Sequence, residues 1–600
     1  MRVADYIATR LAGAGLSHVF MVTGGGAMHL NDAFGRRAGL TCVFFHHEQA
    51  CAMAADAYAR LGGKPAILNV TTGPGGINAL NGVFGAYTDS LPMIVISGQV
   101  RRETIAGNFP SGLRQLGDQE VDIVRMVGGI TKHAVTVQDP SRIRYELEKA
   151  ICLASSGRPG PVWVDVPIDI QGASVDPDQL AGFDPVSQDR SWALPTEADP
   201  LSGEALRHAA RDVIARLGAS SRPCLLPGTG VRIAGQAERF LEVAARLGAP
   251  VATAFNAHDL VANDNPLYAG RAGTVGDRAG NFAVQNADFL LVLGCRLNIR
   301  QISYNWGSFA RGAYKAMVDI DKAELAKPTL SIDLPIHADL TAFLDLLEEE
   351  LAGYQPPATH AEYLAWCRTR VERYPTVLPQ YWEGANGVNP YCFGAALFEG
   401  LDSDDVVVTG DGTACVVTFQ SANLKAGQRL FSNSGSASMG YDIPAAIGAF
   451  HARPGARRIV CIAGDGSVMM NLQELQTIAG ARLPVKLFVL NNDGYHSIRQ
   501  TQQNYFPDNI VGCGPESGVT FPDFQKIGAA FGFPARRVAC HHGMAETIAA
   551  VLAADGPQLC EVMLDKAQAF SPKLSSRKLE DGRMVTSALE DLAPFLSREE

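Results

Sequence analysis

Long apolar runs, basic tracts and a leader-like N-terminus are missing from this 600-residue chain. No stretch approaches the about 18 apolar residues that a membrane-spanning helix needs, and the N-terminal segment lacks the apolar run and cleavage site of a signal peptide. Lys and Arg number 51 against 62 Asp and Glu, a net charge of −11, which disfavours nucleic acid and anionic membranes as partners. We therefore expect a soluble, cytoplasmic protein.

Paired cysteine motifs are also missing. The 12 cysteines are scattered, and no C-x-x-C pair occurs. A zinc framework or redox pair is therefore unsupported, and reduced thiols are expected. The composition, with 47% hydrophobic residues, 61 Gly and 33 Pro, excludes collagen-like, disordered and disulfide-scaffold classes.

Short β-rich segments alternate with Ala-rich helical stretches along the whole chain. This alternation is typical of doubly wound parallel sheets. Two stretches rich in turn-forming residues, 171–196 and 353–390, interrupt it and divide the chain into three α/β domains. The clearest predicted strands are 66–70, 93–97, 162–166, 289–293, 406–409, 458–462 and 485–490.

The first and third blocks share a pattern. In each, a predicted strand leads to a Gly-rich turn, a helix, a Leu-Pro pair and a further strand. Gly75 precedes Pro92 by 17 positions, and Gly466 precedes Pro484 by 18. The pattern suggests a shared topology, although many α/β chains contain such echoes.

The strongest local motif is Gly464-Asp465-Gly466-Ser467, with Asn492 27 positions after the aspartate. Both ends follow predicted strands, at the edge where open sheets bind ligands. Glycines let backbone approach a phosphate, and a helix start presents free N–H groups to it. Asp465 and Asn492 carry the hard oxygens that Mg²⁺ or Ca²⁺ requires. The motif predicts a metal–phosphate site; two unrelated turns are the alternative.

A second segment, His46-His47-Glu48-Gln49, follows a β-rich run and opens a helix. A glutamate in the first helical turn is favourable whatever its function. The segment alone therefore leaves the role of Glu48 open.

Together these motifs resemble the thiamine-diphosphate (ThDP) enzymes of the acetolactate synthase group over nearly the whole chain. The matching segments are HHEQACAMAADAYAR, TTGPGGINALNGVFGAYTDSLPMIVISGQ, SGRPGPVWVDVP, GDGTACV, SGSASMGYDIPAAIGA and GDGSVMMNLQELQTI with LPVKLFVLNND. The resemblance implies a pyrimidine-binding domain over 1–170, a central FAD-binding-type domain over 195–350 and a diphosphate-binding domain over 370–565. The tail, 566–600, would be a lid, with a solvated tail as the alternative.

The resemblance also implies roles for single residues. Glu48 would hydrogen-bond the cofactor's pyrimidine ring, and Met439 would hold the cofactor in a bent form. Asp465, Asn492 and the main-chain carbonyl of Gly494 would bind Mg²⁺. Gln119 matches an active-site glutamine, and His496 is a candidate proton donor. The other implied ThDP-binding residues are Pro74, Asn78, Gly412, Thr413, Ala414, Gly464, Gly466, Ser467 and Tyr495.

The central block carries Gly-rich segments in the order of the group's FAD-binding domain. This implies a structural FAD, because carboligation has no net redox step; a domain that keeps the shape without the flavin is the alternative. The implied FAD-binding residues are Arg158, Gly228, Gly230, Gly270, Arg271, Arg296, Asp319 and Asp339.

The activity implied by the resemblance is carboligation. Such an enzyme decarboxylates pyruvate and transfers the hydroxyethyl unit (activated acetaldehyde) to a 2-oxoacid, ketone or keto-sugar. It would be a homodimer or homotetramer with its active site at the subunit interface. The alternative is a simple 2-oxoacid decarboxylase or lyase that releases an aldehyde. A dehydrogenase is disfavoured, because no G-x-G-x-x-G opens a βαβ unit.

One segment departs from the acetolactate synthase pattern. Thr501 stands where those enzymes usually carry a tryptophan, nine residues after the metal-binding asparagine, and Tyr495-His496-Ser497 replaces an apolar segment. A larger, more polar acceptor pocket is expected. In this respect the chain looks more like the ketone-accepting carboligases of branched-sugar (yersiniose-type) pathways.

Overall fold

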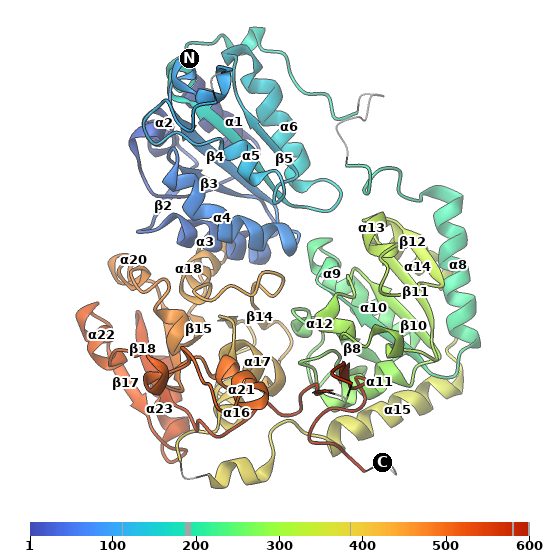
Figure 1. Ribbon diagram of the computed structural model, residues 1–600. Coiled ribbons are helices and arrows are strands. Elements are labelled where there is room, and N and C mark those ends of the chain that lie inside the picture. Colours follow the sequence, from blue (N-terminus) through green and yellow to red (C-terminus); the bar gives the residue numbers. More distant parts are fainter. Residues whose placement is uncertain (111, 187–193, 385, 579–580, 598–600) are drawn as a thin grey trace.

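The computed structural model describes residues 1–110, 112–186, 194–384, 386–578 and 581–597. Three parallel sheets of six strands each, with helices packed over them, confirm the α/β class (Figure 1). Each sheet lies within one of the three predicted blocks. The inner strands are almost wholly buried, as expected for parallel sheets covered on both faces, whereas the edge strands over 41–44, 133–136 and 535–538 are partly exposed. The predicted linker 171–196 includes 187–193, which lie outside the described residues.

The first and third sheets have the same topology, as their shared pattern suggested. Their orders are β2-β1-β3-β4-β6-β5 and β14-β13-β15-β16-β18-β17. Each order reverses between its first and third strands, β1/β3 and β13/β15, where open sheets form ligand crevices. The strands are β1 (His18–Met21), β2 (Thr41–Phe44), β3 (Ala66–Val70), β4 (Met93–Gln99), β5 (His133–Thr136), β6 (Pro161–Pro167), β13 (Val406–Thr409), β14 (Arg429–Phe431), β15 (Ile459–Gly464), β16 (Val485–Asn491), β17 (Ala535–Val538) and β18 (Gln558–Met563).

The helices of these two domains connect their strands in sequence order. In the first domain they are α1 (Val3–Gly13), α2 (Met28–Arg36), α3 (Glu48–Gly62), α4 (Pro74–Thr88), α5 (Ile123–Val127), α6 (Ile143–Ser155) and α7 (Ile168–Gly172). In the third they are α16 (Pro390–Glu399), α17 (Thr413–Ser421), α18 (Asp442–Ala452), α19 (Asp465–Val468), α20 (Glu474–Ala481), α21 (His496–Tyr505), α22 (Phe524–Ala530) and α23 (Met544–Ala553).

The central sheet has a different order, β12-β11-β10-β7-β8-β9. Counted along the chain this is 3-2-1-4-5-6, the order of dinucleotide-binding sheets, with its crevice between β7 and β10. The strands are β7 (Pro223–Pro227), β8 (Val251–Thr253), β9 (Tyr268–Arg271), β10 (Phe289–Leu293), β11 (Tyr314–Asp319) and β12 (Leu334–His337). The helices are α8 (Gly203–Ala219), α9 (Gly230–Ile233), α10 (Ala237–Leu247), α11 (Arg278–Gln285), α12 (Ile299–Ile302), α13 (Lys322–Leu325), α14 (Leu340–Glu350) and α15 (Ala358–Arg373).

Helix α3 is the centre of a core that the first and third domains share. It lies between α4 and α18, and buried residues of both domains form one continuous apolar cluster. Its many alanines let backbones approach closely: a Cβ on Gly448 of α18 would lie 2.0 Å from the Ala54 carbonyl oxygen. The Ala-rich sequence of α3 is therefore explained by helix packing on two sides.

Arg271 joins the central domain to the third. Its buried guanidinium donates to the carbonyl oxygens of Phe419 (2.7 Å), Gln420 (3.1 Å) and Ala422. We predicted Arg271 and Gly270 as FAD-binding residues; that assignment stays a prediction, and the contacts that the structure gives both residues are within the protein. A Cβ on Gly270 would lie 2.4 Å from the Gly280 nitrogen, so this glycine serves the packing of β9 on α11.

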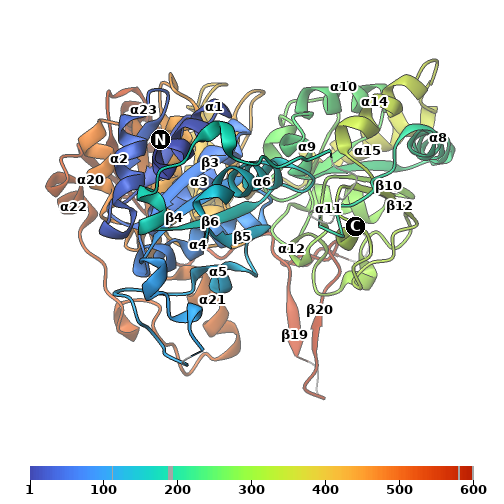
Figure 2. The same cartoon turned by 90° about the horizontal axis from the view of Figure 1, so that it is seen from above.

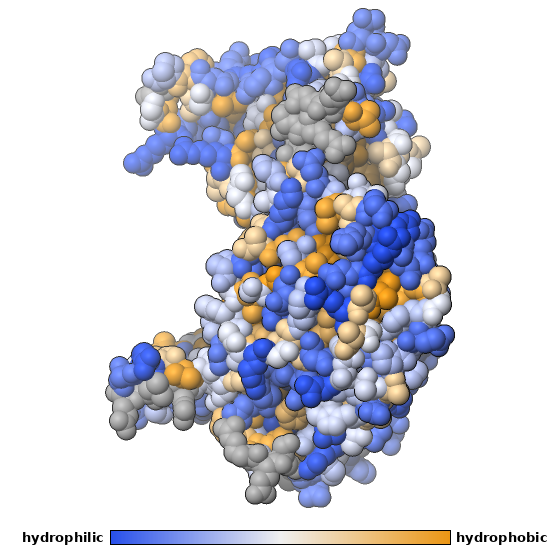
Figure 3. Space-filling model, turned by 90° about the vertical axis from the view of Figure 1, so that its right-hand side faces the viewer, coloured by the Kyte–Doolittle hydropathy of each residue, from blue (hydrophilic) through white to orange (hydrophobic). Residues whose placement is uncertain are grey.

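The described part of the tail lies against the central domain. Asn305 donates to the Thr586 carbonyl oxygen (3.1 Å), and Gln285 donates to Glu590 (2.6 Å). The hairpin of β19 (Ser576–Lys578) and β20 (Met584–Thr586) projects from the body (Figure 2). The face of the molecule on the side of α8, shown in Figure 3, is mostly hydrophilic with apolar residues interspersed. A lid function of the tail remains a prediction.

None of the helices formed by the described residues is long and apolar enough to cross a bilayer.

Replacing Arg271 by Met should destabilise the contact between the central and third domains by about 3 kcal/mol, because buried carbonyl oxygens lose their donors. The measurement is urea unfolding followed by limited proteolysis of the 419–424 region. Arg457→Met is the control, since Arg457 is 65% exposed in a surface ion pair. If Arg271→Met and Arg457→Met had the same free energy of unfolding in urea, the proposed role of Arg271 would be contradicted.

Candidate active site

Glu48 begins α3 at the carboxyl edge of the first sheet. Asn78 on α4 donates to Glu48 Oε2 (3.0 Å), which orients the carboxylate. Gly75 allows α4 to come this close, because a Cβ there would lie 2.8 Å from Thr71 Cγ2 and 3.4 Å from Glu48 Oε1. Pro74 and Asn78 are exposed. Three of the predicted pyrimidine-side residues therefore lie together on an open face.

Asp465 organises the corresponding edge of the third sheet. Its Oδ1 accepts from the Gly466 nitrogen (2.8 Å), and its Oδ2 accepts from the nitrogens of Gly494 (2.9 Å) and Asn492 (3.2 Å). Burial raises the pKa of this carboxyl to about 6, against the lowering effect of the backbone donors. The ends of β15 and β16 are thus held together around one carboxylate.

The predicted metal ligands suit Mg²⁺. Asn492 Oδ1 is buried and has no hydrogen-bond partner among the described residues, while its Nδ2 points to Thr413 Oγ1 at 3.4 Å. An orphaned amide oxygen beside a carboxylate is the donor set that a hard cation takes. No cluster of three or more His, Cys, Asp or Glu able to hold a metal occurs in the described ranges.

The neighbouring loops fit a diphosphate. Gly412 adopts a positive φ of 79° and starts α17, so that Thr413 and Ala414 follow as buried first-turn residues. A Cβ on Gly466 would lie 2.2 Å from the Tyr495 ring, so only glycine fits there. Gly464 has no such close neighbour. Backbone is therefore accessible on both sides of the β13/β15 crevice.

Ser467 shapes the loop that carries Met439. Its Oγ donates to Asp442 (2.5 Å) and accepts from the Gly440 nitrogen (2.8 Å). Burial raises the pKa of Asp442 to about 6. Met439 is half-buried, beside this anchored glycine.

Sequence reasoning missed Arg499, which holds the metal loop from α21. Its Nη1 donates to the Asn492 carbonyl oxygen (3.2 Å), and its Nη2 donates to those of Asp493 (2.7 Å) and Cys513 (3.3 Å). One guanidinium thus joins the loop of the metal ligands to the 513–517 turn. A lone arginine in a polar helix carries no sequence signal of such a role.

Two further predicted catalytic residues, His496 and Gln119, lie at the borders of these clusters. His496 is 6% exposed, and its Nε2 lies 3.0 Å from the Gln568 carbonyl oxygen of the tail. Burial lowers the pKa of His496. Gln119 is exposed with a positive φ of 61°, and a Cβ on Gly73 would lie 2.0 Å from its carbonyl oxygen. Their assignment as catalytic residues remains a prediction.

The two clusters are separate within one chain. Among the described residues, no hydrogen bond or ion pair joins Glu48 to Asp465 or Asn492. The Glu48 cluster faces outward from α4, whereas the Asp465 cluster lies in the third domain's own crevice.

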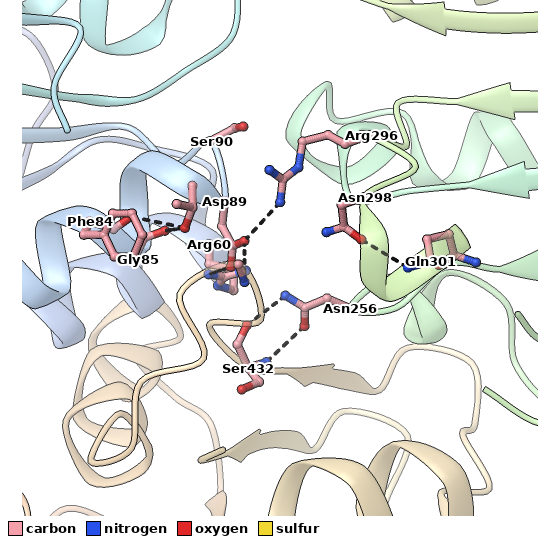
Figure 4. Close-up of polar contacts among 12 residues, drawn as sticks. Arg60, Phe84, Gly85, Asp89, Ser90, Asn256, Arg296, Asn298, Gln301 and Ser432 are labelled. Carbon is pink, nitrogen blue, oxygen red and sulfur yellow. Dashed lines mark hydrogen bonds and ion pairs between the residues drawn. The ribbon is translucent and has the colours of Figure 1, made fainter. Parts of the chain in front are cut away.

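A cavity of about 280 Å³ lies where the central domain meets the first. It opens at the β7/β10 crevice, where a Cβ on Gly228 would lie 2.4 Å from the Gly294 carbonyl oxygen. Arg158 reaches it from the first domain and pairs with Asp321 and Glu324 (3.0 Å each). Burial raises the pKa of Asp319 in its wall to about 6. Figure 4 shows part of this junction.

Six of the eight predicted FAD-binding residues line this cavity. They are Arg158, Gly228, Gly230, Arg296, Asp319 and Asp339; Gly270 and Arg271 do not. Sequence reasoning missed Phe255 and Arg300, whose guanidinium lies 4.9 Å from the Phe255 ring centroid. The sheet order, the close glycine contact and the arginines fit a dinucleotide.

A pyrimidine-side glutamate, a diphosphate crevice with Mg²⁺ ligands and a dinucleotide-type central domain define a ThDP-dependent enzyme. Family models agree: the N-terminal and C-terminal TPP-binding domains of thiamine pyrophosphate enzymes match residues 1–126 and 410–562, and their central domain matches 210–347.

Similar proteins of known name indicate which family of ThDP enzymes the chain resembles. The chain is 32% identical over 584 residues to a probable acetolactate synthase 2 (chloroplastic) of Oryza sativa, covering 96% of this chain and 84% of that protein. It is 31% identical over 573 residues to the acetolactate synthase isozyme 2 large subunit of Escherichia coli, covering 95% and 97%. It is 30% identical over 580 residues to the probable acetolactate synthase large subunit of Methanocaldococcus jannaschii, covering 95% of this chain and 93% of that protein. The chain belongs to the acetolactate synthase family of ThDP enzymes.

Replacing Arg499 by Met should weaken Mg²⁺ binding in the presence of ThDP by roughly 10–100-fold, because residues that position metal ligands typically have effects of this size. Calorimetric titration with Mg²⁺ in the presence of ThDP measures this affinity. Arg499→Lys should recover part of the affinity, and Arg536→Met, an exposed arginine, should leave it unchanged. Unaltered affinity in Arg499→Met would show that Arg499 does not position the loop.

Proposed function

We propose that this protein decarboxylates pyruvate and transfers the hydroxyethyl unit to a carbonyl acceptor, using ThDP and Mg²⁺. The observation that carries this proposal is the Asp465–Asn492 crevice, combined with acetolactate synthase relatives along nearly the whole chain. ThDP, when bound, supplies the electron sink for decarboxylation, and the protein supplies orientation and electrostatics.

In this proposal Glu48 is the proton-handling residue. Asn78 holds Glu48 Oε2, and Oε1 has no partner among the described residues, which leaves it for the cofactor's pyrimidine nitrogen. Met439, on the loop fixed by Ser467, supports the cofactor's bent form. Asp465, Asn492 and the Gly494 carbonyl hold Mg²⁺, and Gln119 faces the substrates.

The acceptor is proposed to be larger or more polar than in branched-chain amino acid synthesis. Helix α21 presents Thr501 as an exposed residue, with Ser497 one turn earlier. A hydroxyl in place of an indole leaves room and offers hydrogen bonds to a ketone or keto-sugar. This is the property that supports a closeness to the branched-sugar (yersiniose-type) carboligases.

A simple decarboxylase that releases an aldehyde is the less favoured alternative. The curated relatives reported above are acetolactate synthases, and such enzymes join two carbonyl compounds. The proposal also includes a structural FAD in the central cavity, supported by its six predicted lining residues.

The proposed active site is shared between two subunits of a homodimer or homotetramer. Next to the Glu48 cluster, Ile77, Phe84 and Tyr87 occupy one face of α4 and are 41%, 40% and 40% exposed. An apolar helix face beside an incomplete site is typical of a subunit interface. A partner's third domain against this face would supply the Mg²⁺–diphosphate half.

Glu48→Gln should lower turnover by about 10²–10⁴-fold, because an amide cannot handle the proton at the pyrimidine ring. NMR analysis of products from pyruvate, with and without an added ketone, measures the activity and identifies the acceptor. ThDP affinity should change little. Glu103→Gln, on an exposed glutamate, should retain full activity. Full turnover by Glu48→Gln would rule out the proposed mechanism, and acetaldehyde as sole wild-type product would favour the decarboxylase.

Phe84→Asp should dissociate the oligomer and abolish activity together, because a carboxylate would be buried in the proposed interface. Sedimentation measures the mass, and the NMR assay measures activity. Val186→Asp is the control, since Val186 is exposed (83%) but lies far from α4 in sequence. A fully active monomer would contradict the shared site.

A further inference from the structure

A second, smaller cavity lies where all three domains meet. Its volume is about 120 Å³, and it shares part of its wall with the dinucleotide-type cavity, including Asp89 and Thr229. Three arginines line it, one from each domain: Arg60 at the end of α3, Arg232 in α9 and Arg429 at the start of β14. None of them belongs to the sites described above.

Each arginine is fixed by a carboxylate through only part of its guanidinium. Arg429 uses Nε to reach Asp259 Oδ2 (2.7 Å), and Arg232 uses Nε to reach Asp259 Oδ1 (2.9 Å). Arg60 has two carboxylate partners: its Nη2 reaches Asp89 Oδ2 (2.8 Å) and Asp56 Oδ1 (3.1 Å), and its Nε reaches Asp56 Oδ1 (3.2 Å). Arg429 Nη1 and Nη2, Arg232 Nη1 and Arg60 Nη1 have no hydrogen-bond partner among the described residues.

The charges around Asp259 leave an excess of positive charge. Its carboxylate is 1% exposed and already accepts from Arg232, Arg429 and the Leu430 nitrogen. Burial lowers the pKa of Arg429, and the neighbouring charges of Arg232 and Arg453 act in the same direction, against Asp259. A bound anion would relieve this repulsion.

Among the described residues that line the cavity, Asp89 is the only carboxylate, and its oxygens are engaged. Oδ2 accepts from Arg60, and Oδ1 accepts from the Gly435 nitrogen (3.0 Å), with Arg296 3.9 Å away (Figure 4). The groups left to a ligand are guanidinium N–H donors, with the Ser155 and Thr229 side chains also in the wall. Converging guanidiniums recognise tetrahedral oxyanions well.

We propose that this three-arginine pocket binds a phosphate group, either as inorganic phosphate or as part of a small phosphorylated molecule. It is separate from the ThDP crevice and adjoins the dinucleotide-type cavity. Because its arginines come from three domains, a bound phosphate links all three and stabilises their present arrangement.

The test is calorimetric titration of inorganic phosphate into the full-length protein saturated with ThDP, Mg²⁺ and FAD, at constant ionic strength. One phosphate per chain is expected. Arg429→Gln and Arg232→Gln should each weaken binding by about tenfold or more, since a charge-assisted hydrogen bond is lost. Arg457→Gln, at an arginine that is 65% exposed in a surface ion pair, should leave phosphate binding unchanged. A small sugar phosphate competing for the same site would identify a phosphorylated metabolite as the source.

Three results would overturn the proposal: no phosphate binding by either the FAD-free or the FAD-saturated protein, equal binding by wild type and Arg429→Gln, or phosphate binding by the FAD-free protein that is lost in the FAD-saturated protein. The last would make the pocket part of the dinucleotide cavity. If Arg429→Gln does not fold, Arg429→Lys is the second variant. It keeps a positive charge to pair with Asp259 but lacks the planar guanidinium, so reduced phosphate binding is still expected. Pyruvate in place of phosphate tests for a carboxylate site, and tighter pyruvate binding would also count against the proposal.

Discussion

The structure depends on one buried carboxylate, Asp89, at the point where its three domains meet. It accepts from Arg60 of its own domain (2.8 Å) and from the Gly435 nitrogen of the third domain (3.0 Å), with Arg296 of the central domain at 3.9 Å (Figure 4). Its side chain is 6% exposed. When a buried carboxylate loses a partner, its charge is left uncompensated. Separating the domains at this point therefore costs free energy. Asp89 lines both cavities, and their shapes follow from this junction.

The candidate Mg²⁺–diphosphate site is held in position mostly by hydrogen bonds to backbone groups. Asp465 collects three backbone nitrogens, Arg499 holds three carbonyl oxygens, and Gly412 and Gly466 keep the crevice open. A parallel sheet brings these backbone groups together, because the loops that follow neighbouring strands meet at one edge of the sheet. An enzyme whose cofactor supplies the electron sink needs such orientation more than it needs many acidic or basic side chains.

Helix α21 follows the metal loop directly and carries the residues on which the acceptor proposal rests. Helix α21 carries Thr501 on its exposed side, whereas His496 at its start contacts the tail through the Gln568 carbonyl oxygen. Helix and tail are thus coupled beside the metal loop. Substrate choice is determined by such loops on a constant scaffold.

The sequence by itself determined the three α/β domains, the shared topology of the first and third, and the cofactor motifs, because strand periodicity and Gly-rich turns are local patterns. It also indicated Asp465 and Asn492, since both directly follow strands. Only the tertiary structure decided that Arg271 binds the third domain, that Arg499 holds the metal loop, and that Arg60, Arg232 and Arg429 line one pocket. These residues contact partners far away in sequence, up to 170 positions for Arg429 and Asp259, and no local pattern records such pairings. Long arginine side chains can point to several neighbours, so packing alone selects which one they reach.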